Sequence, residues 1–255
     1  MRLIAPLLAT LIAGCAPLSA GAAPPVQAPA AAPAYTPRGM VAAANPLAVE
    51  AGLRVLRDGG TAVDAAVAVQ AVLGLVEPQS SGLGGGAFMV FYDARTGKVT
   101  AYDGREKAPQ AATPQLFMGP DGKPLNFVTA VLSGRSTGVP GAVGMLAQAQ
   151  KEHGKAAWNT LFKDAEGLAD GGFTVSPRLA GMINSPRVPQ NVAPDVIAYF
   201  TKPNGQRYQA GDTLKNLAYA ATVRDLAARA PARSTRARWP RRSWTGCARA
   251  ICPPP

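Results

Sequence analysis

Hydrophobic and polar residues begin to follow a regular pattern at Gly39, and the first part of that pattern predicts a short amphipathic helix. Asn45 can cap this helix, and Pro46 suits its first position because a proline there loses no hydrogen bond. Gly59 and Gly60 then end it. The apolar stripe of the predicted helix consists of Leu47, Leu53 and Leu56.

The next segment predicts a second helix and then a hairpin. Thr61 to Asp64 has the form of a capping box, and the Ala/Val-rich stretch up to Val76 has almost no polar face, which indicates a buried helix. After Pro78 and a glycine-rich loop, apolar and aromatic runs at 87–92 and 98–102 flank a short turn. Two such runs around a glycine-containing turn are typical of a β-hairpin, which we expect to be buried.

Downstream periodicity predicts four more helices, at residues 141–153, 156–169, 176–184 and 214–230. Helices on both sides of strands place the chain in the α/β class, in an α+β layered arrangement. Periodicity alone narrows the fold no further.

The glycine loop at 82–86 formally satisfies a dinucleotide-binding fingerprint, with Gly82, Gly84 and Ala87 at the required spacing. That motif must follow a strand and open a helix, whose N-terminus receives the pyrophosphate. Here a helix precedes the loop and a strand follows it. We therefore expect no cofactor, and we interpret the glycines as positions where backbones approach closely.

Composition describes a globular chain with a basic C-terminal part. Its 255 residues are 47% hydrophobic and 16% charged, which is enough for a sizeable core. The net charge of +11 would favour an anionic partner, but seven of the arginines lie between Arg229 and Arg249. Setting these aside leaves 19 basic and 15 acidic residues, or about +4, so the basic signal belongs to that tail.

Cysteine and histidine are too few for a metal site or a disulfide framework. The cysteines are Cys15, Cys247 and Cys252, and His153 is the only histidine. A structural zinc site needs about four ligands at matched spacing. His153 stands at a predicted helix end, where an imidazole can favour the helix dipole without doing chemistry.

The N-terminus has the form of a targeting segment. Arg2, the apolar run at 3–12 and the small residues after it match a secretory signal, so we expect residues 1–23 to be a signal peptide and the protein to be exported to the periplasm or envelope. The segment ending at Cys15 also resembles a bacterial lipobox, in which that cysteine would be lipidated. Ordinary cleavage after residues 20–22 is the alternative. Residues 24–38 then form a Pro/Ala-rich linker.

Residues 39–109 form one continuous stretch that resembles the start of the large chain of gamma-glutamyltransferases, the glutathione hydrolase family of N-terminal nucleophile hydrolases. The string DGREKAP at 103–109 belongs to this likeness, and so do SGRSTGVPG at 133–141 and GFTVSPRL at 172–179. The resemblance extends to about Ala230 and is weaker between 184 and 211. It implies a domain at 39–230 with part of an αββα fold that lacks the small-subunit strands.

Arg105 is the candidate substrate-binding residue. An arginine directly after a strand can present a planar fork to a carboxylate and form two charge-assisted hydrogen bonds. The resemblance implies that it holds the α-carboxylate of the gamma-glutamyl group. The alternative is that Arg105 pairs with Glu106 or Asp103 at the surface.

The resemblance also implies an activity and a missing part. Family members cleave gamma-glutamyl amides such as glutathione and transfer the glutamyl group to water or amino acids, using an N-terminal threonine as nucleophile and no cofactor. The Thr-x-His-x-Ser type surroundings of that threonine are absent here. We therefore expect no catalytic residue in this chain, no activity of the chain alone, and a small-subunit segment as its partner in a complete homologue.

Residues 231–255 depart from this pattern, and we interpret them as a disordered tail produced by a frameshift near Pro231. Synonymous codons for residues 233–245 can be chosen so that a neighbouring frame encodes Ala-Phe-Tyr-Glu-Gly-Ala-Leu, as the family would be expected to have. The alternative is a genuine Arg/Trp tail that binds an anionic membrane or nucleic acid. Export argues against nucleic acid. A second hypothesis for the whole chain is a non-catalytic envelope lipoprotein that binds gamma-glutamyl compounds.

Overall fold

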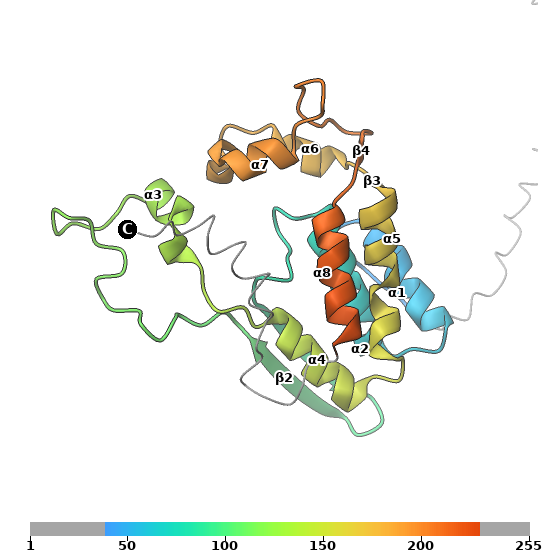
Figure 1. The fold of residues 1–255 in the computed structure, drawn as a ribbon. Helices are drawn as coiled ribbons and strands as arrows, with labels where there is room; N and C mark the ends of the chain where they lie inside the picture. Colours follow the sequence, from blue (N-terminus) through green and yellow to red (C-terminus); the bar gives the residue numbers. More distant parts are fainter. Residues whose placement is uncertain (1–38, 230–255) are drawn as a thin grey trace, which may run out of the picture. The chain divides into compact units, whose positions relative to one another are not determined.

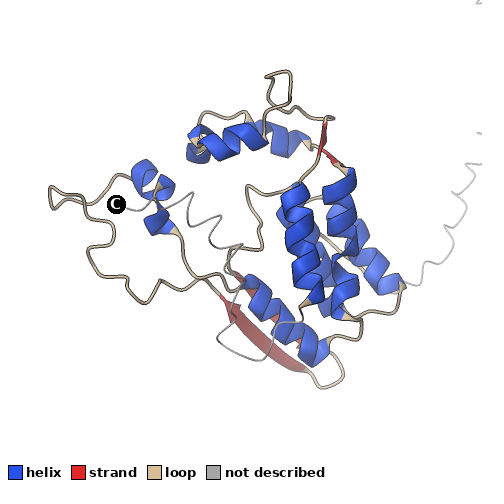
Figure 2. Ribbon diagram, viewed as in Figure 1, coloured by secondary structure: helices blue, strands red, loops and turns tan. Residues whose placement is uncertain are grey.

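The structure is a computed structural model that describes residues 39–229, a mixture of helices and short strands (Figures 1 and 2). The predictions for the signal peptide, Cys15, the linker and the tail lie outside the described residues. The α-helices are α1 (Pro46–Arg57), α2 (Ala62–Val76), α3 (Phe127–Leu132), α4 (Ala142–His153), α5 (Lys163–Gly171), α6 (Pro177–Ile183), α7 (Pro194–Tyr199) and α8 (Leu217–Ala228). The strands are β1 (Ala87–Asp93), β2 (Lys98–Gly104), β3 (Phe173–Thr174) and β4 (Thr213–Leu214), and the 3-10 helices are η1 (Gly134–Ser136), η2 (Trp158–Phe162) and η3 (Pro189–Val192).

The first two helices begin as predicted. The Asn45 side chain accepts a hydrogen bond of 3.0 Å from the Leu47 amide, which caps α1. At α2 the Asp64 carboxylate accepts from the Thr61 amide at 2.8 Å, and the Thr61 hydroxyl accepts from the Asp64 amide at 3.2 Å. The predicted capping box is therefore confirmed.

Helix α2 is the centre of the core, as its apolar sequence predicts. It packs against α1, α4 and α5, and α5 packs in turn against α8 (Figure 1). Each large apolar side chain that is fully buried contributes about 1.5–3 kcal/mol. The buried residues of α2 are Val63, Asp64, Ala65, Val67, Ala68, Ala71, Val72, Gly74, Leu75 and Val76.

The hairpin forms as predicted, but the expectation that it is buried was wrong for one of its faces. Strands β1 and β2 pair antiparallel, with Phe88 opposite Asp103 and Tyr92 opposite Val99. Because side chains alternate across a strand, one face turns Tyr102 towards α4 and buries it. The other face is open to solvent, with Val90 exposed by 74%.

Two of the downstream helices differ from their predicted bounds. The segment expected as one helix at 156–169 begins as the 3-10 helix η2, which contains the buried Leu161 and Phe162, and continues as α5. The helix expected from Leu214 begins at Leu217, because Asn216 caps it by accepting from the Tyr219 amide at 2.9 Å. Leu214 instead pairs with Phe173 across the small β3–β4 sheet.

The short helices α3 and α7 were not predicted from the sequence. Each has six residues and none of them is buried, so the periodic burial that reveals longer helices is absent. Asn126 caps α3 through the Thr129 amide. Helices α4 and α6 follow the prediction closely, with Gly154 and Asn184 as their C-caps.

Candidate functional site

Arg105 follows directly after β2, and its side chain is 70% exposed. The Arg105 amide donates to the Asp103 carboxylate at 2.9 Å, whereas the Arg105 Nε lies 3.4 Å from the Glu106 Oε2. Both neighbours that the sequence offered as surface partners are therefore used, one by the backbone and one by the guanidinium. Arg105 stays a predicted binding residue, with its guanidinium accessible to a ligand.

The glycine loop at 82–86 lies against the residue that follows this arginine. The Gly86 amide donates to the Glu106 Oε1 at 2.7 Å. A Cβ at Gly86 would stand 2.4 Å from the Glu106 Oε2 and 2.8 Å from the Glu106 backbone nitrogen, so a larger residue there would displace Glu106. The loop joins helix α2 to strand β1, which is the order that excludes a dinucleotide fingerprint.

The N-terminus of α4 holds the far side of the same loop. The carbonyl oxygen of Gly85 accepts hydrogen bonds from the amides of Gly141 at 3.2 Å and Ala142 at 3.1 Å. Next to it, Lys107 and Val139 exchange two backbone hydrogen bonds, of 3.1 and 2.7 Å. The backbone after Glu106, and the loop that contacts the Glu106 side chain, are thus held by segments that are distant in sequence.

A buried carboxylate lies at the C-terminal end of α2, before the loop. Glu77 is 1% exposed, and its oxygens accept from Asn45, Gln79, Ser176 and Arg178. Burial alone would raise the pKa of Glu77, but these four hydrogen bonds outweigh it and lower the pKa below its usual value. No local pattern predicted this cluster, because its members lie up to 101 residues from Glu77.

The only histidine is part of a second polar cluster, between the hairpin and α4. The Tyr102 hydroxyl donates to the Glu152 Oε2 at 2.6 Å and lies 2.7 Å from the His153 Nε2. The imidazole stacks on Phe91 with ring centroids 4.0 Å apart. Burial and the hydrogen bond with Glu152 raise the pKa of Tyr102 to about 12. His153 thus helps to fasten the end of α4 to the hairpin, at the helix end where the sequence placed it.

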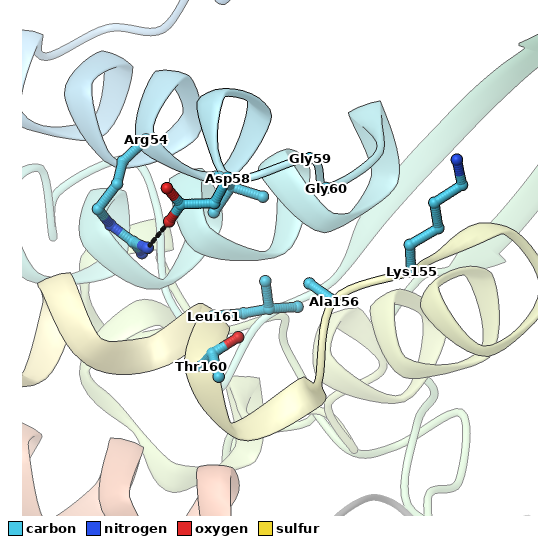
Figure 3. Close-up of a pocket in the computed structure, with 9 residues that line it drawn as sticks. Arg54, Asp58, Gly59, Gly60, Lys155, Ala156, Thr160 and Leu161 are labelled. Carbon is cyan, nitrogen blue, oxygen red and sulfur yellow. Dashed lines mark hydrogen bonds and ion pairs between the residues drawn. The ribbon is translucent and has the colours of Figure 1, made fainter.

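A small hollow lies elsewhere, beside the end of α1 (Figure 3). Its volume is about 100 Å³, and ligand pockets for drug-sized molecules are about 300–1,000 Å³. At its edge the Arg54 Nη1 pairs with the Asp58 Oδ2 at 3.2 Å. Arg105 does not line it. The lining residues are Arg54, Val55, Asp58, Gly59, Gly60, Lys155, Ala156, Thr160 and Leu161.

Within residues 39–229 there is no cluster of three or more histidine, cysteine or acidic side chains placed to hold a metal ion. In the same part of the chain, no helix is long and apolar enough to cross a membrane.

The amino-acid sequence matches a known family. The family model described as gamma-glutamyltranspeptidase matches residues 48–234. The chain belongs to this family. The matched gamma-glutamyltranspeptidase segment contains Arg105, the glycine loop and all eight described α-helices except the first two residues of α1.

Individual gamma-glutamyltranspeptidase relatives agree with this assignment. The glutathione hydrolase proenzyme of Bacillus subtilis (strain 168) is 42% identical over 184 residues, which cover 71% of this chain and 31% of the relative. The chain thus spans about a third of the length of such curated relatives.

Solved structures of this family show the fold. Helicobacter pylori gamma-glutamyltranspeptidase superposes with a TM-score of 0.70 at 33% identity, over 76% of this chain and 55% of that one. Bacillus anthracis transpeptidase enzyme CapD superposes with a TM-score of 0.63 at 30% identity, over 83% of this chain and 65% of that one. The expected fold, part of the N-terminal nucleophile hydrolase αββα arrangement, is therefore confirmed.

Proposed function

We propose that this chain forms the glutamyl-recognition part of an enzyme that cleaves gamma-glutamyl amides such as glutathione, with Arg105 binding the α-carboxylate of the substrate. The observation that carries this proposal is the position of Arg105 at the end of β2, 70% exposed beside an anchored glycine loop, in a chain of the gamma-glutamyltranspeptidase family. A guanidinium on fixed backbone can form two charge-assisted hydrogen bonds with a carboxylate, which sets orientation as well as charge.

In the complete enzyme we propose a two-step transfer. A threonine hydroxyl attacks the gamma-carbonyl carbon while the threonine's own α-amine takes the proton. The amide C–N bond then breaks, and the α-ammonium group returns that proton to the leaving amine. Water or an amino acid then attacks the glutamyl ester and restores the hydroxyl. Arg105 contributes by holding the glutamyl group where the carbonyl meets the nucleophile.

We further propose that the chain on its own binds substrate without turning it over. His153 is the only histidine and residue 151 is a lysine, so the sequence contains no Thr-x-His segment. Mixing the chain with a gamma-glutamyl anilide should release no aniline. Release of aniline that Arg105→Ala abolishes would show that the chain carries its own nucleophile.

Calorimetric titration with glutathione and with L-glutamate tests the binding role. Arg105→Lys keeps the charge but loses the planar fork, so affinity should fall about tenfold. Arg95→Lys is the matched control, because Arg95 is also exposed on the hairpin and paired at 3.4 Å with a neighbouring acid, Asp93. Equal affinities in the two variants would refute a specific role for Arg105.

The second candidate function is a non-catalytic envelope lipoprotein that binds gamma-glutamyl compounds. The lipobox-like segment at Cys15 favours it. Adding a homologue's small-subunit segment separates the two proposals: turnover supports the enzyme, and binding without turnover supports the lipoprotein. The mass of the N-terminal peptide after expression in a bacterium reports whether Cys15 carries lipid.

A further inference from the structure

Glu106 divides its two carboxylate oxygens between the glycine loop and the arginine. Its Oε1 accepts from the Gly86 amide at 2.7 Å, and its Oε2 lies 3.4 Å from the Arg105 Nε. The side chain is 39% exposed, so this carboxylate lies at the surface with its partners and is not a core residue. One side chain thus connects the loop to the proposed binding residue.

Two glycines leave room for the Glu106 side chain. A Cβ at Gly86 would lie 2.4 Å from the Glu106 Oε2 and 2.8 Å from its backbone nitrogen. A Cβ at Gly138 would lie 3.0 Å from the Glu106 Cβ. The two glycines therefore admit the Glu106 side chain between two backbone segments, and the Lys107–Val139 hydrogen bonds hold the strand end next to it.

The contact between Glu106 and the Arg105 Nε bears on the orientation of the guanidinium. A guanidinium carries five N–H groups in one plane, and holding it at Nε fixes that plane while leaving both terminal nitrogens for another carboxylate. Among the described residues, Glu106 is the one carboxylate within ion-pair distance of the Arg105 guanidinium. We propose that Glu106 is a positioning residue that aims the Arg105 guanidinium at the substrate's carboxylate, held in turn by the Gly86 amide. This inference rests on the proposed function of Arg105.

Glu106→Gln changes both the charge beside Arg105 and the orientation of its guanidinium, and these two changes have opposite expected effects on the binding of a carboxylate. Removing a negative charge beside Arg105 would by itself favour an incoming carboxylate, because like charges repel. Losing the ion pair at Nε would weaken binding, because the guanidinium is no longer drawn towards Glu106. A glutamine can still accept from the Gly86 amide, so the variant separates the two contacts of the carboxylate.

The experiment uses the full chain and two measurements. The first is the ¹⁵N NMR signal of the Arg105 Nε–H group, assigned by its loss in Arg105→Lys, and its rate of exchange with water. The second is calorimetric titration with L-glutamate. Glu106→Gln should speed the Nε–H exchange and weaken glutamate binding about threefold, the size expected for an exposed ion pair. Gly86→Ala, which displaces the carboxylate, should have the same two effects.

Glu50→Gln is the matched control. Glu50 is an exposed acid on α1, and its Oε2 lies 3.7 Å from the Arg57 Nη1. This control variant should leave both measurements unchanged. Unchanged Nε–H exchange in Glu106→Gln, or glutamate binding as tight as in the parent chain, would overturn the positioning role. If the parent chain binds neither glutamate nor glutathione, the proposed function is wrong, and the exchange rate alone then decides whether Glu106 holds the arginine.

Discussion

Asn45 and Glu77 meet in the core although they are 32 residues apart, with the Asn45 Nδ2 donating to the Glu77 Oε1 at 2.9 Å. The same asparagine caps α1 through its side-chain oxygen. Ser176 repeats this arrangement at α6, since its hydroxyl accepts from the Leu179 amide and donates to the Glu77 Oε1 at 3.2 Å. Glu77 therefore orients the capping side chains of two helices.

Glu77→Gln should destabilise the chain by about 2 kcal/mol, because charge-assisted hydrogen bonds are lost and an amide group replaces a buried acceptor. Urea unfolding followed by circular dichroism measures this change. Glu50→Gln, at an exposed acid, should shift the free energy of unfolding by less than about 0.5 kcal/mol. Equal shifts in the two variants would show that the Glu77 cluster contributes nothing special.

The buried acids Glu77 and Asp64 should make the stability of the fold sensitive to acid. The pKa of Asp64 lies below its ordinary value of 3.8, because hydrogen bonds led by those from the Lys155 and Thr61 amides outweigh the opposing effect of burial. The pKa of Glu77 is also lowered, from 4.5. A group whose pKa is lower in the folded state stabilises that state above its unfolded pKa, and this stability is lost as pH falls through the folded pKa.

The free energy of unfolding should therefore decline below about pH 4.5, the higher of the two unfolded values. Urea titrations at steps between pH 6 and pH 3 measure the slope. Asp64→Asn cannot titrate, so its stability should be lower at pH 6 and should change less with pH. A slope in this variant as steep as in the parent chain would mean that other groups cause the acid sensitivity.

The open face of the hairpin predicts self-association. Phe88, Val90 and Tyr92 on β1 and Val99 on β2 expose apolar surface side by side, and such patches are sites of association. Val90→Lys should raise the dissociation constant of any self-associated form about tenfold, measured by analytical ultracentrifugation. Val192→Lys, at a similarly exposed valine in η3, is the control. Association that both variants weaken equally would place the contact elsewhere.

Local sequence signals predicted much of this fold because their causes are local. The caps at Asn45 and Thr61, the apolar run of α2 and the turn between β1 and β2 each depend on residues a few positions apart. The burial of the hairpin was predicted incorrectly, because a strand's sequence shows that a face is apolar and not what covers it.

The candidate site was predictable only through family likeness. Periodicity and composition do not distinguish Arg105 from other arginines, whereas the string around it does. The contact between Glu106 and Gly86 joins residues 20 apart, and that between Tyr102 and Glu152 joins residues 50 apart. The first pair forms only when β1 pairs with β2, and the second only when the hairpin packs on α4, so local patterns carry no trace of them.

Two glycines at the start of α4 give a matched test of how closely that helix approaches the strand bearing Arg105. A Cβ at Gly141 would stand 2.4 Å from the Gly104 carbonyl oxygen and 3.0 Å from that of Arg105, and both are backbone atoms that cannot rotate away. At Gly144, one turn later, the same atom meets open space. Gly141→Ala should therefore destabilise the chain by about 2 kcal/mol through forced backbone displacement.

Gly144→Ala should instead stabilise the chain by about 0.5–1 kcal/mol, because alanine loses less backbone entropy in a helix. Thermal unfolding of the two variants measures the opposite signs directly. Since Gly141 also donates to Gly85, its replacement should move the glycine loop and weaken glutamate binding, whereas Gly144→Ala should bind as the parent chain does. A Gly141→Ala variant that is as stable as Gly144→Ala would mean that the helix and the strand end can separate freely. In that case the fixed backbone around Arg105, on which its proposed role depends, would be disproved as well.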